Sequence, residues 1–141
     1  MSKVINTKID DGILTFTFTN NSDEIFASFK LNPTDINVAA RAEEVSDFFD
    51  HLDVTLKNLT SNKEAAELNK TIEDKLNYLL GYEASKDLFR EPITATTFFG
   101  NGQMFALIVL DKIVDAIKPE IEKRRKKMQA AVNKYTEKYT K

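Results

Sequence analysis

Apolar residues recur along the middle of this chain at alternating steps of four and three, from Val38 to Leu59. This spacing places them on one side of an α-helix, which then packs against a sheet or another helix. The preceding segment "NPTD" predicts the start of that helix, with Asn32 as N-cap, Pro33 at the first helical position and Asp35 in the first turn. The repeating residues are Val38, Ala42, Val45, Phe49, Leu52, Leu56 and Leu59.

A second helix is predicted to begin after Ser61. Ser61 and Glu64 have the spacing of a capping box, in which each side chain satisfies a backbone N–H of the other residue. Gly81 stands where a glycine in the left-handed conformation ends a helix. Between these two signals lies an apolar stripe at helical spacing, formed by Ala65, Leu68, Ile72, Leu76 and Leu79.

The segment "QMFALIVLDKIVDAI", residues 103–117, predicts a third helix whose first half is apolar on every side. Such a helix is buried in the core or in a subunit contact. Gly100 and Gly102 come just before it, and we interpret them as a flexible hinge. Pro119 cannot donate a hydrogen bond to Asp115 and its ring clashes with the preceding turn, so we expect the helix to kink or restart there.

Alternation with a period of two predicts strands near the N-terminal end. In "ILTFTFT" the residues Leu14, Phe16 and Phe18 alternate with threonines, and "EIFASFKL", residues 24–31, repeats the pattern. The turn signal "DDG" pairs the first of these strands with "VINTKI", residues 4–9. The sequence therefore predicts an α+β fold: an N-terminal three-stranded antiparallel meander, a mainly helical body and a long C-terminal helix kinked near Pro119.

Charge divides the chain into two parts. Residues 118–141 carry nine basic and three acidic residues, a net charge of +6, and since the whole chain has −2 the remainder carries −8. We interpret residues 1–118 as a single α+β domain and residues 119–141 as a basic helical extension. Cysteine is absent and the first residues do not form a signal peptide. The longest apolar run, residues 104–110, is far shorter than a membrane span, so we expect a cytoplasmic protein.

No residue pattern predicts catalysis, a metal site or a cofactor. His51 is the only histidine, and no nucleophile accompanies it in a catalytic arrangement. The segment "GNGQ" lacks the Lys-Ser/Thr of a phosphate-binding loop. Glu43, Asp47 and Asp50 share one helical side, but they lack calcium-loop spacing and are typical of a solvated acidic face. We therefore predict a protein that is not an enzyme.

Five consecutive basic residues form the sharpest local signal in the chain. One interpretation is that they neutralise nucleic-acid phosphates. The other is contact with an acidic protein surface, such as the body of a neighbouring copy. An acidic body and a pI of about 5.5 weigh against nucleic acid. The basic patch consists of Lys123, Arg124, Arg125, Lys126 and Lys127.

Exposed aromatic and apolar residues are the candidates for binding a protein partner. Near the glycine hinge these are Phe98, Phe99, Met104 and Phe105, for which a place in the core is an equal alternative. Near the C-terminus, Tyr135 and Tyr139 are either anchors for a partner or ordinary members of a helical seam.

The segments "IEDKLNYLLGYEASKDLF" and "GNGQMFALIVLDKIVDAIKPEI" together resemble the tail assembly chaperones of long-tailed bacteriophages, particularly those of Gram-positive hosts. The resemblance covers residues 72–121, about a third of the chain. The family pattern is a helix ending in an apolar-Leu-Gly step, a polar stretch, then Leu-Phe and a closing helix. The matching residues here are Leu80, Gly81, Ser85, Leu88 and Phe89. The basic segment after Pro119 departs from that pattern.

The resemblance implies a non-enzymatic protein that acts in the cytoplasm of the bacterial host. Such a protein binds the long helical tape measure protein, keeps it soluble and helps recruit tail tube subunits, and we also expect it to self-associate. It implies no cofactor. The alternative from the residues themselves is a small nucleic-acid-associated protein that uses the basic C-terminal helix.

Overall fold

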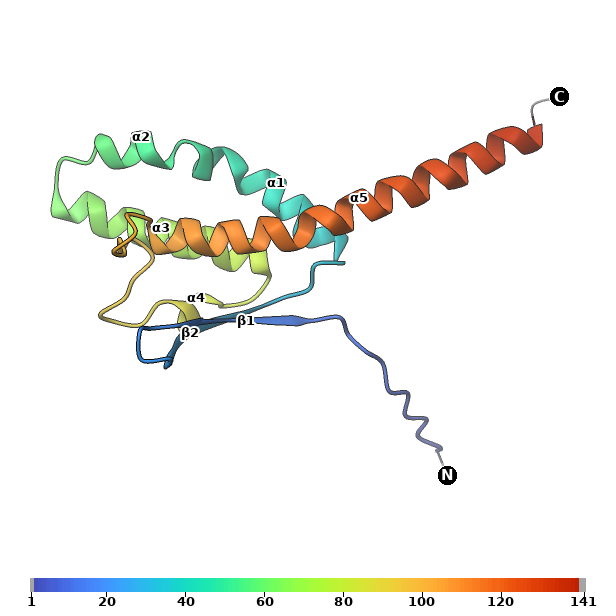
Figure 1. Cartoon of the computed structure of the whole chain (residues 1–141), viewed down its shortest axis with the longest axis horizontal. Helices are drawn as coiled ribbons and strands as arrows, with labels where there is room; N and C mark the ends of the chain where they lie inside the picture. Colours follow the sequence, from blue (N-terminus) through green and yellow to red (C-terminus); the bar gives the residue numbers. More distant parts are fainter. Residues whose placement is uncertain (1, 140–141) are drawn as a thin grey trace.

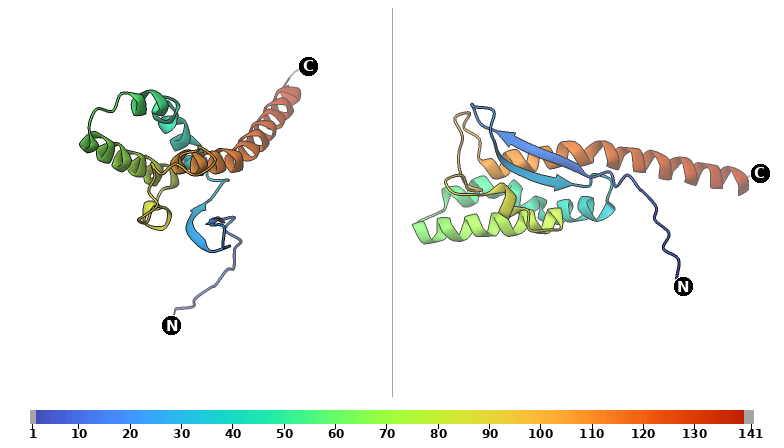
Figure 2. Two further views of the ribbon diagram at one scale, coloured as in Figure 1. Left: turned by 60° about the vertical axis from the view of Figure 1, so that its left-hand side comes forward. Right: turned by 90° about the horizontal axis from the view of Figure 1, so that it is seen from below.

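The computed structural model describes residues 2–139, the last two of them by their backbone alone. Over these residues the chain forms two strands and then five helices, an α+β fold as predicted (Figure 1). The strands lie together on one side of the helices, and the end of the last helix projects from the body (Figures 1 and 2). The elements are β1 (Leu14–Thr19), β2 (Ile25–Leu31), α1 (Ile36–Asp50), α2 (Leu52–Lys57), α3 (Asn62–Leu80), α4 (Ser85–Leu88) and α5 (Phe105–Tyr139).

Strands β1 and β2 form an antiparallel hairpin in which Phe16 is paired with Phe29 and Phe18 with Ala27. The rings of Phe16 and Phe29 stack with their centroids 4.7 Å apart. In β2, Ala27, Phe29 and Leu31 are buried at alternate positions, as the period of two predicted, because one face of the hairpin covers the helices. Ile25, at the start of the same alternation, is 64% exposed. Asn20 closes the hairpin turn, since its side-chain oxygen accepts hydrogen bonds from the backbone N–H groups of Ser22 and Glu24.

The third strand of the predicted meander is not confirmed. Residues 4–9 form no strand, and Val4, Ile5 and Ile9 are 93%, 88% and 76% exposed. The aspartates before Gly12 do form a turn, with the Gly12 N–H donating to the Asp10 side chain at 3.0 Å. However, Val4 falls on the opposite side of an extended chain from Ile5 and Ile9. A strand here would leave apolar residues in water on either face.

The helix predicted from Asn32 to Leu59 is present but differs in two details. Its N-cap is Asp35, whose side chain accepts a hydrogen bond from the Asn37 N–H at 2.9 Å. The predictions of Asn32 as N-cap, Pro33 as the first helical residue and Asp35 within the first turn were therefore wrong, since Pro33 lies in the turn before α1. Asn32 instead accepts from the Thr34 N–H in a turn just before the helix. At His51 the helical path is interrupted, which divides the apolar repeat between α1 and α2.

Helix α3 has the limits that its local signals predicted. The Ser61 side chain accepts a hydrogen bond from the Glu64 N–H at 3.2 Å. Gly81 ends the helix with φ +83°, and its N–H donates to the Asn77 carbonyl. Both are standard solutions for the unsatisfied backbone groups at helix ends.

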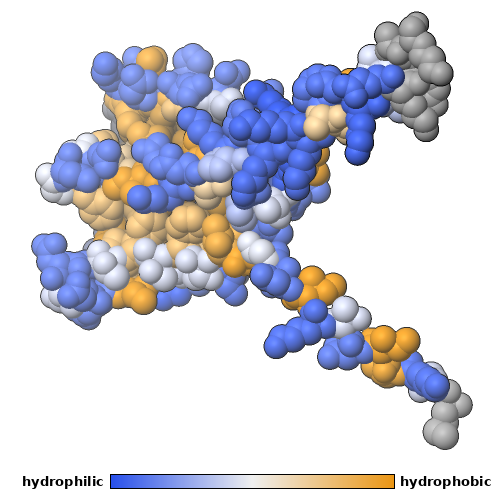
Figure 3. All heavy atoms as spheres, turned by 45° about the vertical axis from the view of Figure 1, so that its right-hand side comes forward, coloured by the Kyte–Doolittle hydropathy of each residue, from blue (hydrophilic) through white to orange (hydrophobic). Residues whose placement is uncertain are grey.

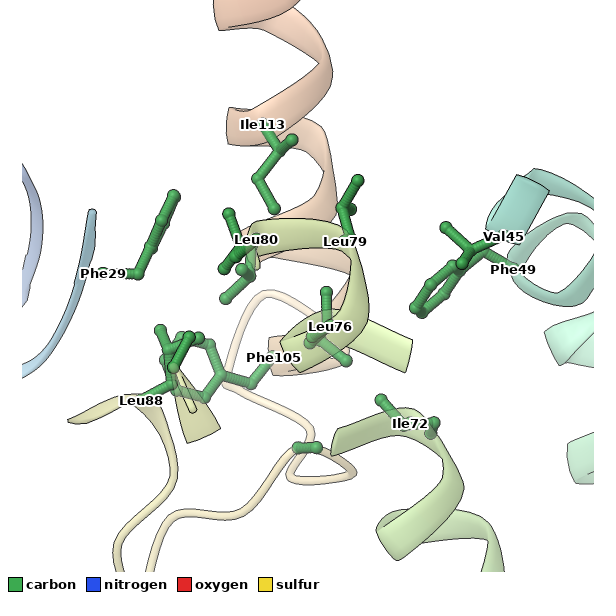
Figure 4. Packing of buried hydrophobic residues seen from close by; sticks show 14 of the residues in the cluster. Phe29, Val45, Phe49, Ile72, Leu76, Leu79, Leu80, Leu88, Phe105 and Ile113 are labelled. Carbon is green, nitrogen blue, oxygen red and sulfur yellow. The ribbon is translucent and has the colours of Figure 1, made fainter. Parts of the chain in front are cut away.

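Helix α3 lies at the centre of the core. In Figure 4 its residues Leu76 and Leu79 stand between Val45 and Phe49 of α1 on one side and Leu80 and the sheet residue Phe29 on the other. Leu76 and Leu79 are both fully buried. Leu88, from the short helix α4, and Ile113, from α5, complete this part of the core (Figure 4).

Helix α5 is one continuous helix of 35 residues, and Pro119 lies inside it. The kink or restart predicted at Pro119 is not confirmed. Pro119 and Asp115 are both exposed, so the Asp115 carbonyl that lacks a helical partner is open to water. The first half is buried through Val109, Ile113 and Ile117, as its apolar sequence predicted. At 1.5 Å per residue the whole helix is about 52 Å long, and it crosses the boundary predicted between body and basic extension.

Candidate functional site

Phe105, the first residue of α5, is the centre of an aromatic cluster. It is fully buried. Its ring centroid lies 5.2 Å from those of Phe18 and Phe99, 5.5 Å from Phe89 and 5.7 Å from Phe26. Most of these pairs are edge-to-face, which is a favoured geometry for aromatic rings. The cluster joins the β-hairpin, the segment after α4 and the start of α5.

The loop that leads into α5 is a hydrogen-bonded turn. The Phe99 N–H donates to the Gln103 carbonyl and the Gly102 N–H donates to the Phe99 carbonyl, both at 2.9 Å. The Phe105 N–H in turn donates to the Thr97 carbonyl at 2.9 Å. Gly102 has φ +81°, a conformation that glycine adopts at low cost. Gly100 and Gly102, where we predicted a hinge, therefore lie in a hydrogen-bonded turn. Movement of the loop at these glycines stays a prediction.

An open groove of about 630 Å³ lies beside this aromatic cluster. The hairpin turn forms one wall and the turn before α5 forms the other. Its floor is mostly apolar and its rim carries asparagine side chains, a combination typical of sites that accept an apolar group. We call it the aromatic groove. It is lined by Phe18, Thr19, Asn20, Asn21, Phe26, Ile93, Phe99, Gly100, Asn101, Phe105 and Ile108.

The structure separates the four partner-binding candidates near the glycines. Met104 and Phe105 are 1% and 0% exposed, so they belong to the core and do not face a partner in this conformation. Phe99 is half-buried and lines the aromatic groove. Phe98, its neighbour in the chain, is 60% exposed. Only Phe98 and Phe99 therefore remain accessible to a partner.

A stripe of apolar residues runs along α5 from the body onto the projecting end. Its members recur every seven residues, and each such step turns back by only about 20° around the helix. The stripe is half-buried on the body, whereas Met128 and Tyr135 are 68% and 67% exposed. Val132 lies beside these two and is 56% exposed. The α5 stripe consists of Leu107, Val114, Ile121, Met128 and Tyr135.

The tyrosines and the basic patch lie on this projecting end. The side chain of Tyr139 is outside the described residues. The basic residues spread around the helix, and two of them form short-range ion pairs: Lys123 with Glu120 at 3.5 Å and Arg125 with Glu122 at 3.6 Å. Arg124 is half-buried, and its Nη2 atom is covered without a hydrogen-bond partner in the described part of the chain. Lys126 and Lys127 are exposed.

Few side chains in the described residues are candidates for catalysis or metal binding. His51 is exposed, and its Nδ1 atom lies 2.8 Å from the Asp47 backbone carbonyl. Burial raises the pKa of Glu73 and that of Tyr82, but neither residue lines the aromatic groove. Within residues 2–139, no group of three or more metal-ligating side chains is placed to hold an ion.

Sequence reasoning missed Phe18, Phe26 and Phe89 as neighbours of Phe105. The alternation of strand residues indicated that Phe18 faces the core, but it carries no information about which loop it meets there. Over the same described range, none of the helices has the length and apolar character needed to cross a membrane. Comparisons of this chain with protein-family models, with curated proteins and with solved structures find no match.

Proposed function

We propose that this protein is a tail assembly chaperone of a long-tailed bacteriophage. In this role it binds the tape measure protein by packing, without catalysis, and helps recruit tail tube subunits in the cytoplasm of the bacterial host. The proposal is supported by the resemblance of residues 72–121 to that family. It is also supported by accessible apolar surface on a chain whose sequence predicts no catalytic site.

The observation that carries the proposal is the α5 stripe. Two helices pack along each other through apolar residues at alternating steps of four and three, and Met128, Val132 and Tyr135 have this spacing on the projecting end. Leu107 and Ile121 already pack against the core of this chain. The accessible part of the stripe is therefore about 10.5 Å long, and it offers a helical partner such as a tape measure segment an apolar contact.

The aromatic groove provides a second place where a partner side chain would fit. Its apolar floor accommodates an aliphatic or aromatic group, and exposed Phe98 stands on the same loop. Interfaces concentrate their binding energy in aromatic pockets that become desolvated when the partner is bound. We assign the groove to the same class of contact, with either the tape measure or the tail tube protein.

Co-expression with the tape measure protein of the same phage tests the proposal. We expect the wild-type chain to raise the soluble fraction of the tape measure protein. The double variant Met128→Asp with Tyr135→Asp places two charges in the α5 stripe and should abolish that effect. Its matched control is Ala130→Asp with Asn133→Asp, which adds the same charge to other sides of the same helix.

The control variant should keep the tape measure protein soluble as the wild type does. Equal solubility with the stripe variant would show that the stripe is not the contact. A wild-type chain that leaves the tape measure protein insoluble would overturn the proposed function itself. The neighbouring genes give an independent check, since a tail tube gene upstream and a very long helical gene downstream are expected.

A further inference from the structure

The projecting end of α5 has a second face that the stripe does not use. Every residue from Arg125 to Glu137 is exposed, and most of this segment is blue in Figure 3. Lys123, Lys127 and Lys134 follow one another at helical spacing and lie together on one side of the helix, with Lys127 and Lys134 about 100° around the axis from Met128 and Tyr135 of the α5 stripe. We call these three lysines the basic face. Lys127 and Lys134 form no ion pair with any described residue.

The body carries an opposite surface on α1. Glu43, Asp47 and Asp50 are exposed at steps of four and three, which aligns them on one side of the helix. They lie opposite Val45 and Phe49, the residues that α1 buries in the core. None of the three carboxylates has a cation within ion-pair distance in the described range. We call this the acidic face.

The two faces match in spacing as well as in charge. Glu43 and Asp50 are seven residues apart, and so are Lys127 and Lys134. On an α-helix this separation is about 10.5 Å in both cases. Two helices side by side therefore pair both lysines with both carboxylates at the same time, as Lys134 with Glu43 and Lys127 with Asp50 when antiparallel, and with the partners exchanged when parallel.

Within one molecule the two faces cannot meet. Helix α5 is continuous from Phe105 to Tyr139, so its basic face is carried away from the body (Figure 1). A second copy of the tail is a poor partner, because residues 118–141 carry a net charge of +6 and like charges repel. The remainder of the chain carries −8, and a second copy presents that surface to the tail.

We propose that this chain self-associates by docking the basic face of α5 from one copy on the acidic face of α1 of another copy. The basic face then loses its repulsion and the acidic face gains cations that its own molecule does not supply. This contact uses a different side of α5 from the α5 stripe. It requires no tape measure protein, so it stands or fails separately from the proposed function.

Charge exchange in the full chain tests the contact. The tail variant changes Lys123, Lys127 and Lys134 to Glu, and the body variant changes Glu43, Asp47 and Asp50 to Lys. Sedimentation over a range of protein concentrations at 50 and 500 mM salt gives the association constant. The matched control changes Lys3, Lys8 and Lys63 to Glu, which alters the net charge equally without touching the tail. Circular dichroism checks that each variant keeps its helices.

We expect wild-type association to weaken at high salt because exposed charges are screened. Each triple variant should weaken association at least about tenfold, since both attractive contacts become repulsive. An equimolar mixture of the two triple variants should associate again, because an acidic tail then meets a basic body and the reverse. The matched control should associate no less tightly than the wild type.

Three results would overturn this proposal. The first is a wild-type chain that stays monomeric at 50 mM salt, and the second is association in both triple variants that is as tight as in the wild type. The third is an equimolar mixture of the two triple variants that fails to associate. If a duplex oligonucleotide then binds the wild type and not the tail variant, the basic face is assigned to nucleic-acid phosphates instead.

Discussion

The hydroxyl oxygen of Tyr82 accepts a hydrogen bond from the backbone N–H of Lys30 at 2.6 Å, across 52 residues of sequence. Lys30 belongs to β2, and Tyr82 follows the end of α3. The contact satisfies a backbone donor of β2 that β1 does not use, and it fixes the hairpin to the helical layer.

Removing that hydroxyl should weaken the fold. We expect Tyr82→Phe to lower the free energy of unfolding by about 1 kcal/mol, the usual net value of one such hydrogen bond. Urea denaturation measures the change. Tyr78→Phe is a matched control, because its hydroxyl donates to the Glu44 side chain and not to any group of the hairpin, and there we expect an effect of about 0.5 kcal/mol or less. Equal losses in both variants would mean that the hydroxyl does not hold the hairpin.

Two glycines at helix boundaries should respond differently to alanine. Gly81 has φ +83°, and a Cβ atom there would lie 3.1 Å from Nη2 of Arg41. We expect Gly81→Ala to cost about 1 kcal/mol of folding stability. A Cβ atom at Gly100 meets nothing within 4 Å and its φ is not positive, so Gly100→Ala should be neutral or slightly stabilising. Chemical denaturation of the pair checks this, and a reversed order would contradict the capping role of Gly81.

Substitutions at Phe105 and Phe98 should separate an effect on folding stability from an effect on partner binding. Phe105→Ala removes the centre of the aromatic cluster and should cost about 3–5 kcal/mol, seen as a large fall in the midpoint of denaturation. Phe98→Ala should change stability by no more than about 0.5 kcal/mol, since the side chain is 60% exposed. If Phe98 contacts the tape measure protein, the same variant reduces the solubilising effect in co-expression. Unchanged solubilisation would remove Phe98 from the contact.

Pro119 should limit the stability of α5. The proline removes one helical hydrogen bond and strains the preceding turn, at a cost of about 3 kcal/mol in a helix interior. We therefore expect Pro119→Ala to slow hydrogen exchange of the backbone amides on both sides of this position. Exchange measured by mass spectrometry on peptides that cover residues 112–130 tests this. No change would show that the helix already absorbs the proline without strain.

Local signals in the sequence predicted the elements whose ends depend on neighbouring residues. Ser61 and Gly81 mark the limits of α3 because a cap acts within one turn of its own helix. The strand predicted at residues 4–9 depended on a turn signal alone, and its apolar residues did not share a face. Asn32 and Asp35 are both good N-caps, and only the three-dimensional path of the chain decides between them.

The candidate surfaces were harder to predict because burial is decided by distant contacts. Phe98 and Phe105 are only seven residues apart, yet one is 60% and the other 0% exposed. The difference comes from Phe18, Phe26 and Phe89, which the fold brings to Phe105 from far along the chain. The match between the basic face and the acidic face likewise requires knowing that α1 turns its carboxylates outward and that α5 extends beyond the body.

Helix α5 connects the aromatic cluster at Phe105 to the exposed tail as one continuous helix. Over about 52 Å, a swing of about 5° at the buried end displaces the far end by about 4–5 Å. A molecule that binds the tail thereby sets the orientation of the whole body. Successive copies attached along a shared filament through their tails would be held in a common orientation.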